Sequence, residues 1–258
     1  MTGTKKPKRD EAFDTNMADA ELLLRMSSAT QNQRLRRARV ELRNRVGEAL
    51  RIPMRDRGEI HCVESDDLFI VIKPGSTSSS EDFDDPRPLL RQALVAGCAA
   101  TETFLNDLTM DYISQVTKVS HKASTNRPKA LRDIVMNVDQ WLLIELHYQR
   151  RRRGLREVVL REYIGDNAST APNKVGHLMS LLGITQWAHK LDSQRKVTKG
   201  NSVEFLDAVT KRRNLIAHTG DRKGNGRAAI TAAEVDIYLS GLRSIAEGLD
   251  SIVSSHFS

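Results

Sequence analysis

Arg213 and His218 are the two residues whose types and spacing could do chemistry together, in the segment Arg213-Asn214-Leu215-Ile216-Ala217-His218. The guanidinium group of arginine grips phosphate in a two-pronged way, and histidine exchanges a proton near neutral pH more readily than other side chains. Such a pair could do acid–base chemistry on an anionic substrate. The alternative is an arginine and a histidine that only pack and cap a helix.

The spacing alone is weak evidence. The chain has 27 arginines and seven histidines in 258 residues, so chance alone nearly accounts for one Arg–His pair at any fixed spacing. The surrounding pattern is more informative. Residues 201–218 form an amphipathic helical pattern in which Arg212 and Arg213 fall within the apolar arc. Arginines on a buried face are costly unless they meet an anion or an interface.

Arg213 and His218 lie about 140° apart on an ideal helix. The two groups converge if the arginine side chain wraps round the helix, or if the helix ends at His218, as Thr219-Gly220 indicates. A second subunit could also supply the partner, since a symmetric dimer that buries this helix brings two copies of the pair together.

The composition is that of a basic, aliphatic and globular chain. The net charge of +7, carried largely by arginine, is weak evidence for a polyanionic partner such as nucleic acid. No apolar run reaches the roughly 18 residues of a membrane span. Cys62 and Cys98 are isolated, which fits a reducing cytoplasm. The histidines have no metal-ligand spacing, so neither a metal nor another cofactor is predicted.

The N-terminal third predicts an appendage to a helical domain. Residues 1–16 are polar without periodicity and are expected to be a disordered basic tail. A helical pattern runs over 18–50, and two alternating apolar runs at 60–62 and 68–72 predict a β-hairpin. The Pro-, Gly- and Ser-rich stretch that follows is typical of a linker. We therefore predict a helix-and-hairpin unit over 17–84 and a helical domain over 85–258.

The helical domain is expected to be built from helices over 88–119, 130–152, 155–164, 174–182 and 201–218 and a last helix after Thr231. Gly97 lies on the apolar stripe of the first helix and would let another helix approach closely. Thr231 and Glu234 form a capping-box pattern. The second helix ends in Arg150-Arg151-Arg152-Arg153, which is either a solvated end or an RNA-binding patch.

The segment from Arg213 to His218 resembles the HEPN-superfamily motif, in which an arginine is followed after four to six residues by a histidine. Asn214 supplies the polar residue that often follows the arginine. The segment 99–108 resembles the first long HEPN helix, where an acidic residue commonly faces the active site, and Glu102 holds that place. The resemblance spans about residues 86–255 and is closest to the RiboL-PSP-HEPN type. It implies an up-and-down helical bundle, with the N-terminal helix and hairpin as an extension.

The resemblance also implies a metal-independent endoribonuclease. His218 would take the proton of a ribose 2′-hydroxyl, Arg213 would stabilise charge on the phosphoryl oxygens, and Asn214 would orient His218 or the phosphate. The products would be a 2′,3′-cyclic phosphate and a 5′-hydroxyl. Arg212 is expected to support phosphate binding, and the basic residues expected to bind RNA are Arg150, Arg151, Arg152, Arg153, Arg222 and Lys223.

The partners implied are an RNA substrate, a second copy that completes a composite site, and an antitoxin or regulatory protein, as in toxin and phage-defence systems. HEPN toxins silenced by nucleotidyltransferase antitoxins often carry a tyrosine two residues after the histidine, where this chain has Gly220. The main alternative is a catalytically silent HEPN domain that binds RNA or a protein. A third interpretation is a helical dimerisation or regulatory module.

Overall fold

The computed structural model describes residues 8–32, 36–37, 39–63, 69–72, 87–119, 129–130, 154–224 and 226–258. This part of the chain is mainly helical, as the sequence predicts. Its helices are α1 (Lys8–Asn32), α2 (Val40–Ala49), the 3-10 helix η1 (Met54–Glu59), α3 (Arg87–Val119), α5 (Gly154–Asn167), α6 (Pro172–Leu181), α7 (Trp187–Arg195), α8 (Asn201–Thr219) and α9 (Ala232–Phe257).

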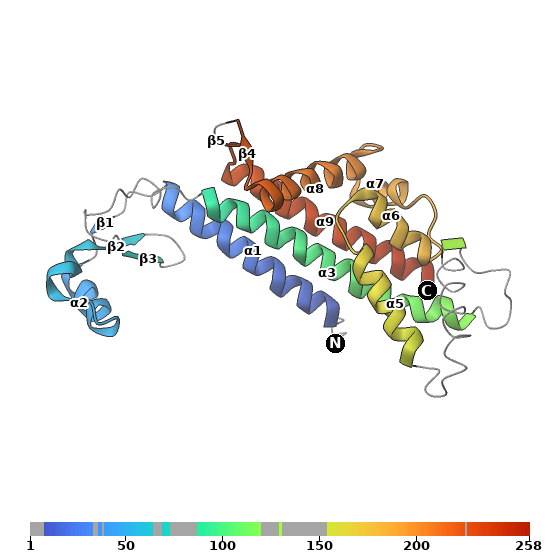
Figure 1. The fold of residues 1–258 in the computed structure, drawn as a ribbon, viewed down its shortest axis with the longest axis horizontal. Helices are drawn as coiled ribbons and strands as arrows, with labels where there is room; N and C mark the ends of the chain where they lie inside the picture. The colour runs from blue at the N-terminus through green and yellow to red at the C-terminus, as the bar shows by residue number, and fades with distance from the viewer. Residues whose placement is uncertain are drawn as a thin grey trace.

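Three long helices, α1, α3 and α9, lie side by side, and α5, α6, α7 and α8 complete the bundle on the other side of α3 and α9 (Figure 1). The predicted apolar stripe of α3 is confirmed, since Leu90, Leu94 and Leu108 are fully buried. Gly97 allows the predicted close approach, because a Cβ atom there would lie 2.3 Å from Leu239 Cδ2 of α9. This packing fixes α3 at the centre of the bundle.

The first helix differs from the prediction at both ends. Residues 8–16 are not a disordered tail but the first turns of α1, and residues 1–7 lie outside the described part. Phe13, Met17, Ala20 and Leu24 recur at spacings of four and three and are buried, with the Phe13 ring 5.0 Å from that of Phe104. Burial of this stripe stabilises a helix in a segment that looks polar along the sequence.

The predicted continuous helix over 18–50 is also wrong, because α1 ends at Asn32 and a short strand, β1 (Arg36–Arg37), precedes α2. Since α1 packs on α3 and α9, it belongs to the bundle rather than to a separate unit over 17–84. The appendage is therefore the part around α2, η1 and the strands, drawn beyond the C-terminal end of α1 in Figure 1.

The predicted β-hairpin is present as β2 (Ile60–Val63) and β3 (Phe69–Ile72), an antiparallel pair with Ile60 opposite Ile72 and Cys62 opposite Ile70. β1 adds a third, antiparallel strand on the other side of β2. The turn between β2 and β3, at 64–68, and the expected linker at 74–82 lie outside the described residues.

Helices α3, α5, α6, α8 and α9 lie close to their predicted positions. Thr231 caps α9, its Oγ1 accepting the Glu234 N–H at 3.1 Å. The short helix α7 was not predicted, because it buries only Leu191 and Asp192 and shows no apolar stripe. The helix expected over 130–152 falls outside the described residues, Ala130 excepted. Among the helices described, none has the length and apolar composition of a membrane span.

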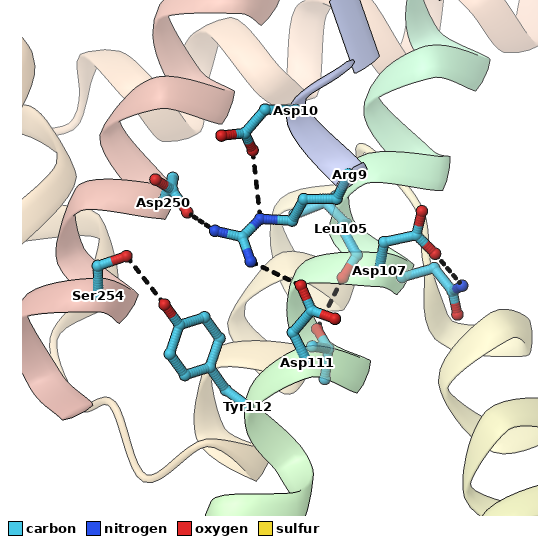
Figure 2. A network of polar contacts seen from close by, with 10 residues as sticks. Arg9, Asp10, Leu105, Asp107, Asp111, Tyr112, Asp250 and Ser254 are labelled. Atoms are coloured by element: carbon cyan, nitrogen blue, oxygen red, sulfur yellow. Dashed lines mark hydrogen bonds and ion pairs between the residues drawn. The ribbon is translucent and has the colours of Figure 1, made fainter. Parts of the chain in front are cut away.

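Arg9 joins α1 to the other two long helices, as Figure 2 shows. Its buried guanidinium donates to Asp111 Oδ2 of α3 at 2.7 Å and to Asp250 of α9, and it lies 5.6 Å from the centre of the Tyr112 ring. The Tyr112 hydroxyl in turn lies 3.0 Å from Ser254 Oγ of α9. One arginine therefore links the three long helices.

Replacing Arg9 by methionine is expected to lower the free energy of unfolding by about 1.5–3 kcal/mol, the usual range for hydrogen bonds to charged groups. The loss stays moderate because Asp111 and Asp250 are partly exposed, so water can solvate both carboxylates once the arginine is gone. Urea unfolding measures the change, with Lys8→Met at the exposed neighbouring position as control. Equal stability of the two variants would show that Arg9 does not hold α1 on the bundle.

Candidate functional site

Helix α8 carries the predicted motif, and local capping fixes both of its ends. Asp192 Oδ2 accepts the Gly200 N–H at 2.7 Å and Oδ1 accepts the Ser202 N–H at 2.9 Å, which satisfies free donors at the first turn. At the other end Gly220 adopts a left-handed conformation with φ of 60°. The predicted end of the helix beside His218 is thus confirmed, with Thr219 as the last helical residue.

Arg213 lies on the buried face of α8, between Leu206, Val209 and Ile216. Its Nη2 donates to Glu102 Oε2 of α3 at 3.2 Å, and its Nη1 donates to Asn214 Oδ1 at 3.0 Å. The structure therefore brings together three of the residues predicted from the sequence, Arg213, Asn214 and Glu102. The buried arc is narrower than predicted, because Leu215 on its edge is 48% exposed.

Polar side chains continue behind this cluster. Cys98 lies one turn before Glu102 on α3, and the buried Thr170 hydroxyl lies 2.9 Å from Thr210 Oγ1 of α8. Burial, and then the nearby Glu102 carboxylate, raise the pKa of the Cys98 thiol to about 12. Neither Cys98 nor Thr170 was predicted to lie here, because no sequence pattern around either residue indicates contact with α8.

Cys98 is expected to resist alkylation in the folded protein, because the thiolate is the reactive species and about one thiol in ten thousand is ionised at pH 8 when the pKa is near 12. Iodoacetamide labelling followed by peptide mass analysis separates Cys98 from Cys62. Labelling of Cys98 should begin only when urea unfolds the chain. Labelling at the rate of a free thiol without urea would contradict this burial.

Arg212 does not join Arg213. Its Nη1 donates to Asp221 Oδ1 at 2.7 Å and its Nη2 to the Ala229 carbonyl at 2.7 Å. Arg91 of α3 donates to the other carboxylate oxygen of Asp221 at 2.8 Å. Asp221 is therefore a buried carboxylate shared by two arginines. This arrangement gives Arg212 a structural partner inside the protein, whereas the sequence suggested support for a bound phosphate.

His218 is exposed at the end of α8, where its side chain lines a shallow hollow of about 540 Å³. The hollow is also lined by Thr219, Gly220, Arg222 and Arg227. Arg222 belongs to strand β4 (Arg222–Lys223) and Arg227 to strand β5 (Gly226–Arg227), which pair antiparallel. The sequence predicted Arg222 and missed Arg227, whose position depends on this pairing.

Arg213 and His218 do not meet within one chain. Arg213 faces α3, His218 is exposed, and within the described residues no hydrogen bond or ion pair joins them. Lys223 is exposed but does not line the hollow. The predicted patch Arg150, Arg151, Arg152 and Arg153 lies outside the described residues. The described part of the chain therefore holds two separate candidate half-sites: the cluster of Arg213, Asn214 and Glu102, and the hollow at His218.

No set of three His, Cys, Asp or Glu side chains in the described part is arranged to hold a metal ion. The His177 ring lies 2.9 Å from the Tyr163 hydroxyl, and burial lowers the pKa of His177. Tyr163 lies on α5 and His177 on α6, outside the two half-sites.

Comparison with known proteins adds no assignment. No family model matches the chain, and no curated protein or solved structure matches it either. Any function must therefore be argued from the residues of the two half-sites.

Proposed function

We propose that this chain is a metal-independent endoribonuclease of the HEPN type. The observation that carries the proposal is the placement of His218 at the exposed end of α8, in a hollow that it shares with Arg222 and Arg227. An exposed imidazole beside two guanidinium groups is suited to taking a proton from a group held next to a phosphate. RNA supplies both, as the 2′-hydroxyl and the adjacent phosphodiester.

The reaction is an internal transesterification. His218 removes the proton of the 2′-hydroxyl, the 2′-oxygen forms a bond to phosphorus, and the bond from phosphorus to the 5′-oxygen breaks. The leaving 5′-oxygen takes up a proton from the solvent and His218 returns its proton to the solvent, so the products are a 2′,3′-cyclic phosphate and a 5′-hydroxyl with no oxidant or water consumed. Arg213 stabilises the charge on the phosphoryl oxygens, and Asn214 and Glu102 hold its guanidinium.

A second copy of the chain completes the site in this proposal, because Arg213 and His218 of one chain lie on different sides of α8. Two exposed apolar side chains favour such a contact, Leu215 on α8 at 48% and Ile237 on α9 at 63%. The two helices pack together, with Phe205 against Tyr238 and Arg212 near Glu234. A symmetric dimer through this face would place one copy's Arg213 beside the other's His218.

A catalytically silent HEPN domain that binds RNA is the second candidate. It is favoured by the ion pair between Arg213 and Glu102, which already neutralises the guanidinium that the reaction requires. As an enzyme, the protein would act on cytoplasmic RNA in a toxin or phage-defence role, restrained by an antitoxin or another regulatory protein.

A cleavage assay with EDTA tests the proposal. Purified protein is incubated with a panel of end-labelled tRNA, rRNA and mRNA fragments, beside DNA of the same sequences. We expect cleavage of RNA, ends that carry 2′,3′-cyclic phosphate and 5′-hydroxyl groups, and intact DNA. RNA that stays intact across the panel would remove the enzyme proposal, and retained RNA binding would then support the silent domain.

A further inference from the structure

The hairpin of β4 and β5 carries two arginines in an unfavourable arrangement. Arg222 and Arg227 are directly opposite each other in the antiparallel register. Side chains at such positions start about 4.5–5.5 Å apart, and like charges there destabilise the pair. An anion between the two charges would offset this repulsion.

No protein anion fills this role in the part of the chain described. The side chains of Arg222 and Arg227 make no ion pair or hydrogen bond within the described residues, and both residues are exposed. The nearest carboxylate in sequence, Asp221, is buried and already shared by Arg91 and Arg212. Among the described residues, the lining of the hollow therefore holds the two arginine charges beside His218 and no acidic side chain.

The hairpin is also held firmly in place. Arg91 Nη2 donates to the Ala228 carbonyl at 2.9 Å, Arg212 Nη2 donates to the Ala229 carbonyl at 2.7 Å, and the Ala228 N–H donates to the Asp221 carbonyl at 2.8 Å. These bonds fix the strand that carries Arg227 relative to α3 and α8. The backbone that carries the two arginines is thus positioned before any ligand arrives, which lowers part of the entropic cost of binding.

We propose that Arg222 and Arg227 together bind one phosphate group of the RNA backbone beside His218. Guanidinium groups match phosphate with paired hydrogen bonds, and one phosphate between two arginines removes their mutual repulsion. Asp221 is the positioning residue of this element. The inference rests on the proposed function in that RNA is the ligand, but it concerns binding and not cleavage.

Lys223 provides a control within the same hairpin. Successive residues of a strand point to opposite faces, and Lys223 does not line the hollow. Its charge equals that of Arg222 and its exposure is similar. Replacing Lys223 should therefore weaken RNA binding less than replacing either arginine, although the sequence predicts RNA binding for Lys223 and Arg222 alike.

The test measures binding of a fluorescent 2′-O-methyl oligoribonucleotide, which cannot be cleaved because it lacks the free 2′-hydroxyl. Anisotropy titrations over a series of salt concentrations give the slope of log affinity against log salt. Each phosphate neutralised on a single strand contributes about 0.7 to this slope. The variants are Arg222→Gln, Arg227→Gln, the double variant and Lys223→Gln.

With one shared phosphate, each single arginine variant should bind several-fold more weakly with little change in slope. The double variant should lose about 0.7 in slope, and Lys223→Gln should weaken binding less than either single arginine variant. A loss of about 0.7 in each single variant and about 1.4 in the double variant would mean two separate phosphates and overturn the proposal. A double variant that binds like Lys223→Gln, or a wild type that does not bind, would overturn it as well.

These titrations, together with the cleavage assay, distinguish failure of the phosphate site from failure of the nuclease proposal. A wild type that binds through the two arginines and leaves ordinary RNA intact supports the phosphate site and rejects the enzyme. A wild type that cuts RNA while the double variant keeps the full salt slope rejects the phosphate site alone.

Discussion

Replacing His218 by alanine is expected to lower the rate of RNA cleavage by about 10²–10⁴-fold, the usual contribution of a general base. His218 is exposed at the end of α8, and its side chain makes no hydrogen bond or ion pair within the described residues, so the folded structure does not depend on the imidazole. The free energy of unfolding should therefore change by less than about 0.5 kcal/mol. Initial cleavage rates in EDTA and thermal unfolding measure the two effects separately.

His189→Ala is the matched control, because His189 is also an exposed histidine on a helix, α7, away from both half-sites. Its cleavage rate should equal that of the wild type. A His218→Ala variant that cuts RNA as fast as His189→Ala would remove His218 from the reaction. His218→Gln keeps polarity without the ability to exchange a proton, and it should be as slow as the alanine variant.

Replacing Asp221 by alanine is expected to give the largest loss of stability, about 3–5 kcal/mol, which is the usual cost of removing one partner from a buried ion pair. The Asp221 side chain is 1% exposed and lies between Arg91 at 5% and Arg212 at 13%. Without it, two buried cations lose their shared anion. Urea unfolding of the full chain measures the loss.

Two further variants show where this loss comes from. Asp207 forms an exposed ion pair with Lys211 at 2.6 Å on the same helix as Arg212, and Asp207→Ala should cost less than about 1 kcal/mol. Asp221→Asn keeps the shape of the side chain and tolerates the left-handed backbone at φ 65°. Asp221→Asn should therefore show most of the stability loss of Asp221→Ala, because it removes the negative charge alone. Similar stability of Asp221→Asn and wild type would contradict the electrostatic explanation.

Strong periodicity and capping made the central helices predictable. The stripe of α3, the capped start of α9 and the end of α8 beside Gly220 all depend on neighbours within one or two turns. The division of the N-terminal region was not predictable in this way. β1 forms because Arg36 and Arg37 pair with β2, and such long-range pairing leaves no local pattern. The first turns of α1 depend likewise on burial of Arg9 and Phe13 against α3 and α9.

The same distinction between local and long-range contacts applies to the candidate site. Glu102 was expected at the site of Arg213 because its segment resembles the first long HEPN helix, and Arg213 because it lies within the apolar arc of its own helix. Asp221 was missed because its partner Arg91 lies 130 residues earlier in the chain. Arg227 was missed because its position opposite Arg222 depends on the register of a two-residue strand pair. Sequence patterns thus indicated which helices carry the site, and tertiary contacts determined which charges are free.

Mixing two variants that each lack one residue of the pair shows whether RNA is cut at a site shared by two copies. Arg213→Ala and His218→Ala are each purified, combined in equal amounts and allowed to exchange subunits. Half of the dimers are then mixed, and each mixed dimer holds one of its two sites with both Arg213 and His218 intact. We expect the mixture to regain about a quarter of the wild-type cleavage rate. A mixture as inactive as either variant alone, under conditions where the wild type cuts RNA and subunits exchange, would contradict the shared site.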